Sequence, residues 1–97
     1  MARKARTPLP KAPVAQTLEV ERVQTGVRIE KRMLKVLKAL AEYKDMTLSD
    51  LLEGIVLHAF ESEAPFSTET MQRIEELKKI YGLKLDASAS HKMRERP

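Results

Sequence analysis

The side chains capable of catalytic chemistry are few, and their spacing does not form a catalytic site. The chain has two histidines and no cysteine, so neither a thiolate metal site nor a paired-histidine site is expected. Its closely spaced carboxylates, at Glu61/Glu63 and Glu75/Glu76, are typical of solvated helix faces rather than of acid–base pairs. Phosphate-loop and dinucleotide-binding glycine patterns are absent. We predict that the chain is not an enzyme and uses no cofactor.

The charged residues are strongly segregated along the chain. Before residue 39, ten lysines and arginines stand against three acids, and between residues 42 and 76 nine acids stand against two bases. After residue 76 there are six bases and two acids. This segregation is typical of a protein that presents one face to a polyanion. A solvated basic tail beside an acidic helix explains it equally well.

The first predicted structural element along the chain is a strand over residues 22–29. Its two alternating sets are Val23, Thr25, Val27 and Ile29 on one side, and Arg22, Gln24, Gly26 and Arg28 on the other. A period of two predicts a strand with one apolar and one polar face. The sequence contains no second strand, and unpaired backbone groups on a buried edge are costly. The strand is therefore predicted to pair with a second copy of the chain in a homodimer.

Amphipathic helices are predicted from residue 30 or 31 to 44, from 48 to 61 and from 68 to 81. Thr47 is placed to cap the second helix, and Asp50, three residues later, makes an acidic variant of the capping box. Ser67 is placed to cap the third helix, and Gly82 is the expected stop. These helices supply the apolar faces that the strand needs for a core.

The order of strand, helix, turn and helix over residues 22–60 resembles the ribbon-helix-helix (Arc/MetJ/CopG-type) family of DNA-binding proteins. Residues 24–29 match the family's strand, residues 33–41 its first helix and residues 46–56 its turn and second helix, without gaps. The resemblance implies a mainly α fold with one short strand per chain. The two strands would pair antiparallel in an intertwined homodimer and enter the major groove of DNA. The third predicted helix is an addition to this pattern.

The resemblance also assigns two sets of DNA contacts. Base-reading positions are Gln24, Gly26 and Arg28, while phosphate-binding positions are Arg22, Lys31, Arg32, Thr47, Leu48 and Ser49. Arg28 and Gln24 can make bidentate contacts to guanine and adenine, and free amides at a helix N-terminus attract phosphate. Two alternatives compete with these roles. Arg28 can instead pair with Glu30 or another nearby acid, and Thr47 can act as a helix cap alone.

Gly26 departs from the family pattern, because it offers no side chain at the middle reading position. Either the ribbon approaches DNA more closely there, or specificity depends on DNA shape together with Gln24 and Arg28. Glycine also weakens a strand. The departure affects sequence readout more than DNA binding itself.

The expected organisation has four parts: a flexible basic arm (1–17), the dimerisation and DNA-binding domain (18–62), a C-terminal helix (63–83) and a disordered basic tail (84–97). The arm is expected either to follow a phosphate backbone or enter an adjacent minor groove, or to act only as a solubilising tail. With no signal peptide or membrane span expected, the cytoplasm and its nucleoid are the predicted location. The predicted function is a dimeric, repressor-like transcriptional regulator that binds double-stranded DNA. The alternatives are an antitoxin whose C-terminal region binds a partner protein, and a dimerisation module that does not bind DNA.

Overall fold

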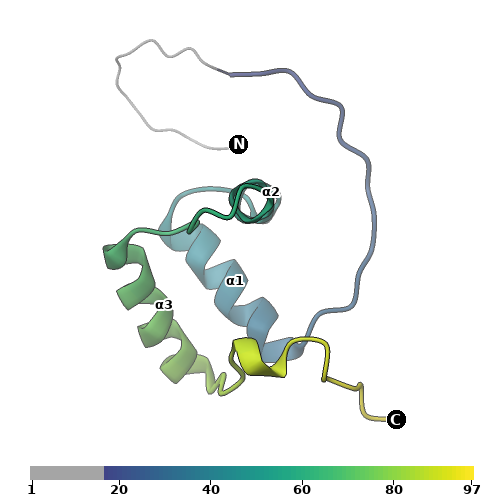
Figure 1. Cartoon of the computed structure of the whole chain (residues 1–97), viewed down its shortest axis with the longest axis vertical. Coiled ribbons are helices and arrows are strands. Elements are labelled where there is room, and N and C mark those ends of the chain that lie inside the picture. Colours follow the sequence, from purple (N-terminus) through teal and green to yellow (C-terminus); the bar gives the residue numbers. More distant parts are fainter. Residues whose placement is uncertain (1–16) are drawn as a thin grey trace.

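A computed structural model describes residues 17–97, which form three α-helices and one short 3₁₀ helix. They are α1 (Lys31–Tyr43), α2 (Leu48–Phe60), α3 (Thr68–Tyr81) and η1 (Ala87–Ala89) (Figure 1). The structure confirms a mainly α fold with an additional C-terminal helix. The basic arm predicted over residues 1–17 lies outside the described residues except for its last position.

The helix ends follow from local side-chain chemistry. The hydroxyl of Thr47 accepts a hydrogen bond from the Asp50 amide at 3.0 Å, and the hydroxyl of Ser67 accepts one from the Thr70 amide at 3.1 Å. Gly82 ends α3 in the left-handed conformation, with φ at 70°, which glycine adopts at little cost. The three caps were all predicted. One part of the expected capping box differs: the Asp50 carboxylate accepts a hydrogen bond from Arg22 instead of from the Thr47 amide.

The core lies where α1 contacts both α2 and α3 (Figure 1). Leu40, in the last turn of α1, is 2% exposed and clusters with Ala41 and Leu51. Partly buried side chains surround this cluster: Leu37, Met46, Leu48, Ile55, Phe66, Ile74 and Leu77. The core is small, since only four hydrophobic residues between positions 17 and 97 are buried. Small cores of this kind stabilise a single chain weakly.

Two polar contacts fasten α3 to α1 beside this core. The guanidinium of Arg73 lies 4.5 Å from the centre of the Tyr43 ring, a cation–π distance. The buried Thr70 hydroxyl accepts from the Lys44 ammonium at 3.5 Å. The C-terminal helix α3 is thus integrated into the fold of the single chain.

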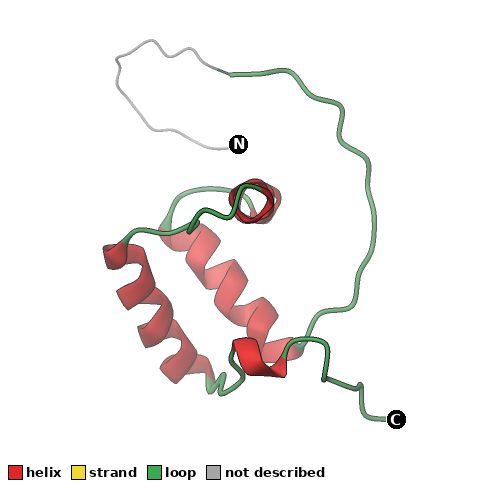
Figure 2. Ribbon diagram, in the orientation of Figure 1, coloured by secondary structure: helices red, strands yellow, loops and turns green. Residues whose placement is uncertain are grey.

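Residues 17–30 form a long loop that runs outside the helices and leads directly into α1 (Figure 2). None of the residues from 17 to 97 is in a β-strand. Within the same range, no backbone group of residues 17–29 hydrogen-bonds to another part of the backbone. A ladder needs a second strand, and the strand predicted for residues 22–29 was expected to pair between chains. The ribbon therefore stays a prediction about the dimer.

The C-terminal residues return toward the start of α1 after the turn at Gly82 and the short η1 helix (Figure 1). Asp86 caps η1, because its carboxylate accepts from the amide of Ser88 at 3.0 Å and from its hydroxyl at 2.5 Å. These hydrogen bonds lower the pKa of Asp86. No helix within residues 17–97 is long and apolar enough to cross a membrane.

Candidate nucleic-acid interface

The three predicted base-reading residues lie on the exposed loop before α1. Gln24, Gly26 and Arg28 are all exposed to solvent. Val23 and Val27 of the alternating apolar set are exposed as well, at 81% and 74%, while Ile29 is half-buried. Leaving valines this accessible is unfavourable in water. The single chain thus leaves most of both faces of the predicted strand exposed to solvent.

Arg28 is engaged by a carboxylate from the far end of the chain. Its Nε donates to both carboxylate oxygens of Glu95, at 2.9 and 3.1 Å, and its Nη2 donates to the same group. These hydrogen bonds raise the pKa of Arg28 and lower the pKa of Glu95. Glu30, the acid expected as an alternative partner, is occupied elsewhere, because its carboxylate caps α1 by accepting from the Met33 amide at 2.7 Å. Arg28 therefore forms an ion pair, as the alternative to base reading predicted, but its partner is Glu95, which is far away in the sequence, and not Glu30.

Arg22, a predicted phosphate contact, binds two acidic residues of α2. Its Nε and Nη2 donate to the Glu53 carboxylate at 2.8 Å each, and Nη2 also donates to Asp50 at 3.1 Å. The hydrogen bond and charge of Arg22 lower the pKa of Glu53. The contribution of this ion pair is therefore present at neutral pH and decreases as acid protonates the Glu53 carboxylate. Arg22 holds the loop against α2 in the single chain, so a phosphate would have to compete with both acids.

The remaining phosphate-binding candidates fall into two groups at opposite ends of α1. Lys31 and Arg32 are exposed at its first turn, beside Arg28. Thr47, Leu48 and Ser49 follow its last turn, where α2 begins. A helix of 13 residues separates the groups by about 20 Å. One chain therefore does not bring the two groups together at one point.

Thr47 serves as the helix cap whether or not it also contacts phosphate. Its hydroxyl satisfies the Asp50 amide, one of the otherwise unpaired groups of the first turn. We expect Thr47→Ala to lower the free energy of unfolding by about 1 kcal/mol, because that amide loses its partner. Urea unfolding followed by circular dichroism measures the change. Thr47→Ser, which keeps the hydroxyl, should stay close to the wild-type protein, and an equal loss in both variants would contradict the capping role.

The exposed side of α2 carries an apolar face without a cover in the single chain. Val56 is about half exposed, Leu57 is largely exposed, and Phe60 is 79% exposed. Glu53, the partner of Arg22, shares this side, because residues 53, 57 and 60 follow helical spacing. The loop that carries the predicted strand is therefore attached beside the apolar face of α2.

Sequence reasoning missed the acidic partners of both arginines. Glu53 and Glu95 lie 31 and 67 positions away from the arginines that they bind, and no local pattern connects residues so far apart. Among residues 17–97, no group of three or more histidine or carboxylate side chains is placed to hold a metal ion. No protein-family model, curated protein or solved structure matches the chain. The functional assignment therefore depends on the chain's own residues and geometry.

Proposed function

We propose that this chain is a dimeric DNA-binding protein, a repressor-like transcriptional regulator that inserts a two-stranded β-ribbon into the major groove. The observation that carries the proposal is the segment from Arg22 to Ile29. Its polar and apolar residues alternate, its backbone has no partner within residues 17–97, and it leads directly into α1. A two-stranded ribbon from two such segments fits the width of the major groove.

A second copy of the chain accounts for the apolar surface that the single chain leaves exposed. The loop contributes Val23 and Val27, and α2 contributes Leu57 and Phe60. Pairing two loops would satisfy their backbone groups and turn the valines toward the helices of the dimer. The small core of each chain would then be extended by the core of its partner, which is a common solution for short domains.

In the proposed dimer the opposite face of the ribbon carries Gln24, Gly26 and Arg28 toward the bases. Arg28 would bind guanine and Gln24 adenine, each through two hydrogen bonds. Lys31 and Arg32 would contact phosphates without reading sequence. The amides at the start of the second copy's α2 would bind the neighbouring backbone phosphates. Because Gly26 has no side chain, the middle of the ribbon would either recognise the shape of the DNA or approach the DNA more closely.

The packing of α3 favours a DNA-binding regulator over an antitoxin whose C-terminal region folds on a partner. Ile74 and Leu77 of α3 already contact the core of the single chain, and Arg73 stacks on Tyr43 of α1. A segment that waits for a partner to order it would lack such contacts. The proposed function therefore assigns α3 to the stability of the domain.

Fluorescence anisotropy with labelled duplex DNA at several salt concentrations tests the proposed function. We expect binding that weakens steeply as salt rises, because each neutralised phosphate releases counterions. A duplex pool of random sequence serves as the probe, and selection of bound sequences then identifies preferred sites. Absence of binding to any duplex at low salt would contradict the proposal and leave the dimerisation module as the alternative.

Arg28→Ala separates base reading from phosphate contact in the same assay. For a selected site, we expect affinity to fall by about ten-fold or more and preference to relax at one base position. Lys31→Ala is the matched control, since it removes one charge next to the ribbon and should weaken all sequences about equally. A uniform loss in Arg28→Ala would mean that Arg28 contacts phosphate.

A further inference from the structure

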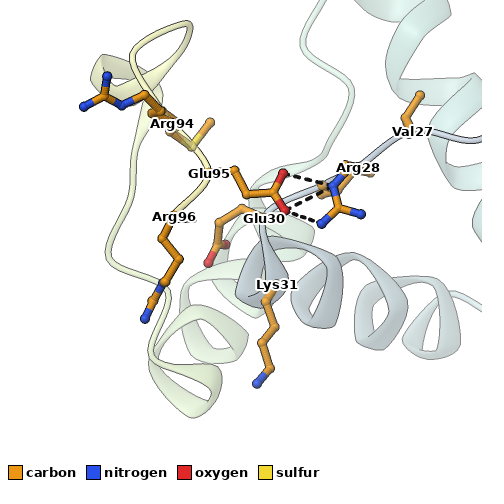
Figure 3. Close-up of a pocket in the computed structure, with 9 residues that line it drawn as sticks. Val27, Arg28, Glu30, Lys31, Arg94, Glu95 and Arg96 are labelled. Carbon is orange, nitrogen blue, oxygen red and sulfur yellow. Dashed lines mark hydrogen bonds and ion pairs between the residues drawn. The ribbon is translucent and has the colours of Figure 1, made fainter.

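The C-terminal residues lie against the segment that would read DNA. Residues 93–96 and residues 27–31 line a common cleft beside the start of α1 (Figure 3). Glu95 points across this cleft to Arg28, while the side chains of Arg94 and Arg96 point away from it (Figure 3). The one acidic side chain in residues 93–96 is therefore the one directed at the predicted reading arginine.

The contact uses the same donors that a base would need. Glu95 accepts from Nε and Nη2 of Arg28 through both carboxylate oxygens, a paired arrangement that Arg favours with carboxylates. A guanine also presents two acceptors, O6 and N7, to an arginine in the major groove. The carboxylate and the base edge would therefore compete for one guanidinium.

We propose that residues 93–96 form an autoinhibitory segment, in which Glu95 occupies Arg28 and must be displaced before Arg28 can bind a base. The inference rests on the proposed function, since it assumes that Arg28 contacts DNA. Glu30, the nearest acid in the sequence, caps α1 and leaves Arg28 available to the segment. The C-terminal residues would in this way raise the threshold for binding and favour sites that offer Arg28 a good partner.

The contact between Glu95 and Arg28 restrains Arg28 only weakly. The side chains of Arg28 and Glu95 are 83% and 61% exposed, and exposed ion pairs contribute little. We therefore expect release of Arg28 to tighten DNA binding by up to about five-fold. A weak restraint of this size modulates affinity without preventing binding.

The test is a conservative substitution rather than a deletion, because deleting residues 93–96 would also remove two arginines. Glu95→Gln keeps the size of the side chain and removes its charge. Glu63→Gln is the matched control, since it changes the net charge equally at an exposed residue of the turn between α2 and α3. DNA affinity is measured by anisotropy for both variants in the full chain, alone and combined with Arg28→Ala.

A second readout does not depend on DNA. The Nε–H signal of Arg28 in the nitrogen-15 NMR spectrum of the free protein should shift in Glu95→Gln and stay in place in Glu63→Gln. An unchanged signal in Glu95→Gln would show that the contact does not form and would overturn the proposal.

The expected result is tighter binding for Glu95→Gln than for Glu63→Gln, with the difference lost in the Arg28→Ala background. Equal affinities of the wild-type protein and both variants would overturn autoinhibition while DNA binding itself stands. Equal gains in DNA affinity in the two variants would mean that the change in net charge alone causes the effect. That result would also overturn autoinhibition. If no variant binds any duplex at low salt, the proposed function fails, and autoinhibition fails with it.

Discussion

Replacing Leu40 with alanine is expected to lower the free energy of unfolding by about 2–5 kcal/mol. Leu40 is almost completely buried where α1 meets α2 and α3. Truncation removes buried methyl groups and leaves a cavity that the surrounding side chains cannot fill completely. Because the core of each chain is small, we expect the urea midpoint of Leu40→Ala to fall strongly, or the variant to be unfolded in buffer.

The matched control is Ile80→Ala, which truncates an aliphatic side chain that is 71% exposed on α3. Its stability should stay within about 0.5 kcal/mol of the wild-type protein, as is usual for surface substitutions. Urea unfolding followed by circular dichroism measures both variants. Similar losses at the two positions would contradict the placement of the core around Leu40.

Val27→Asp is expected to abolish the dimer. In the single chain Val27 is exposed, so an aspartate there has no buried surroundings and carries little penalty. In the proposed dimer the same position lies under the ribbon, where an unpaired carboxylate is strongly unfavourable. Sedimentation equilibrium should therefore show a monomer, and the stability of the variant should lose the dependence on protein concentration that a dimer shows.

Gln24→Asp is the control for that experiment, because it adds the same charge on the opposite face of the predicted strand. We expect it to remain dimeric. A Val27→Asp protein that stays dimeric would exclude the valine face from the interface. A wild-type protein that is monomeric at every concentration would contradict the ribbon itself.

Much of the local structure could be predicted from neighbouring residues. Thr47 and Ser67 cap their helices through amides only three positions away, and Gly82 ends α3 in the conformation that glycine favours. Such contacts depend on a few dihedral angles, so the residue types alone indicate them. The alternation of residues 22–29 likewise predicts which side chains share a face. It cannot show what covers that face, because no part of residues 17–97 covers Val23 or Val27.

The partners of the charged side chains could not be predicted in the same way. Arg22 and Arg28 belong to one polar face by alternation, yet the fold gives them different acids, Glu53 on α2 and Glu95 near the C-terminus. Asp50 illustrates the same limit, because its position suits a capping box while its carboxylate binds Arg22. Long side chains reach several acceptors, and the nearest one is known only when the helices are in place.

By itself, the sequence of this protein determined the three helices, their ends and the alternation of the segment before α1, since each depends on residues within one or two turns. Only the tertiary structure decided that α3 packs on α1, that the core centres on Leu40, and that the last residues return to Arg28. These features join positions far apart in the chain. The first two arise from the burial of apolar side chains, which is non-directional, and the third is an exposed ion pair between Arg28 and Glu95. The two chemically distinctive arginines, Arg22 and Arg28, therefore acquired their surroundings from the tertiary fold, through Glu53 on α2 and Glu95 in the C-terminal segment, and not from their neighbours in the sequence.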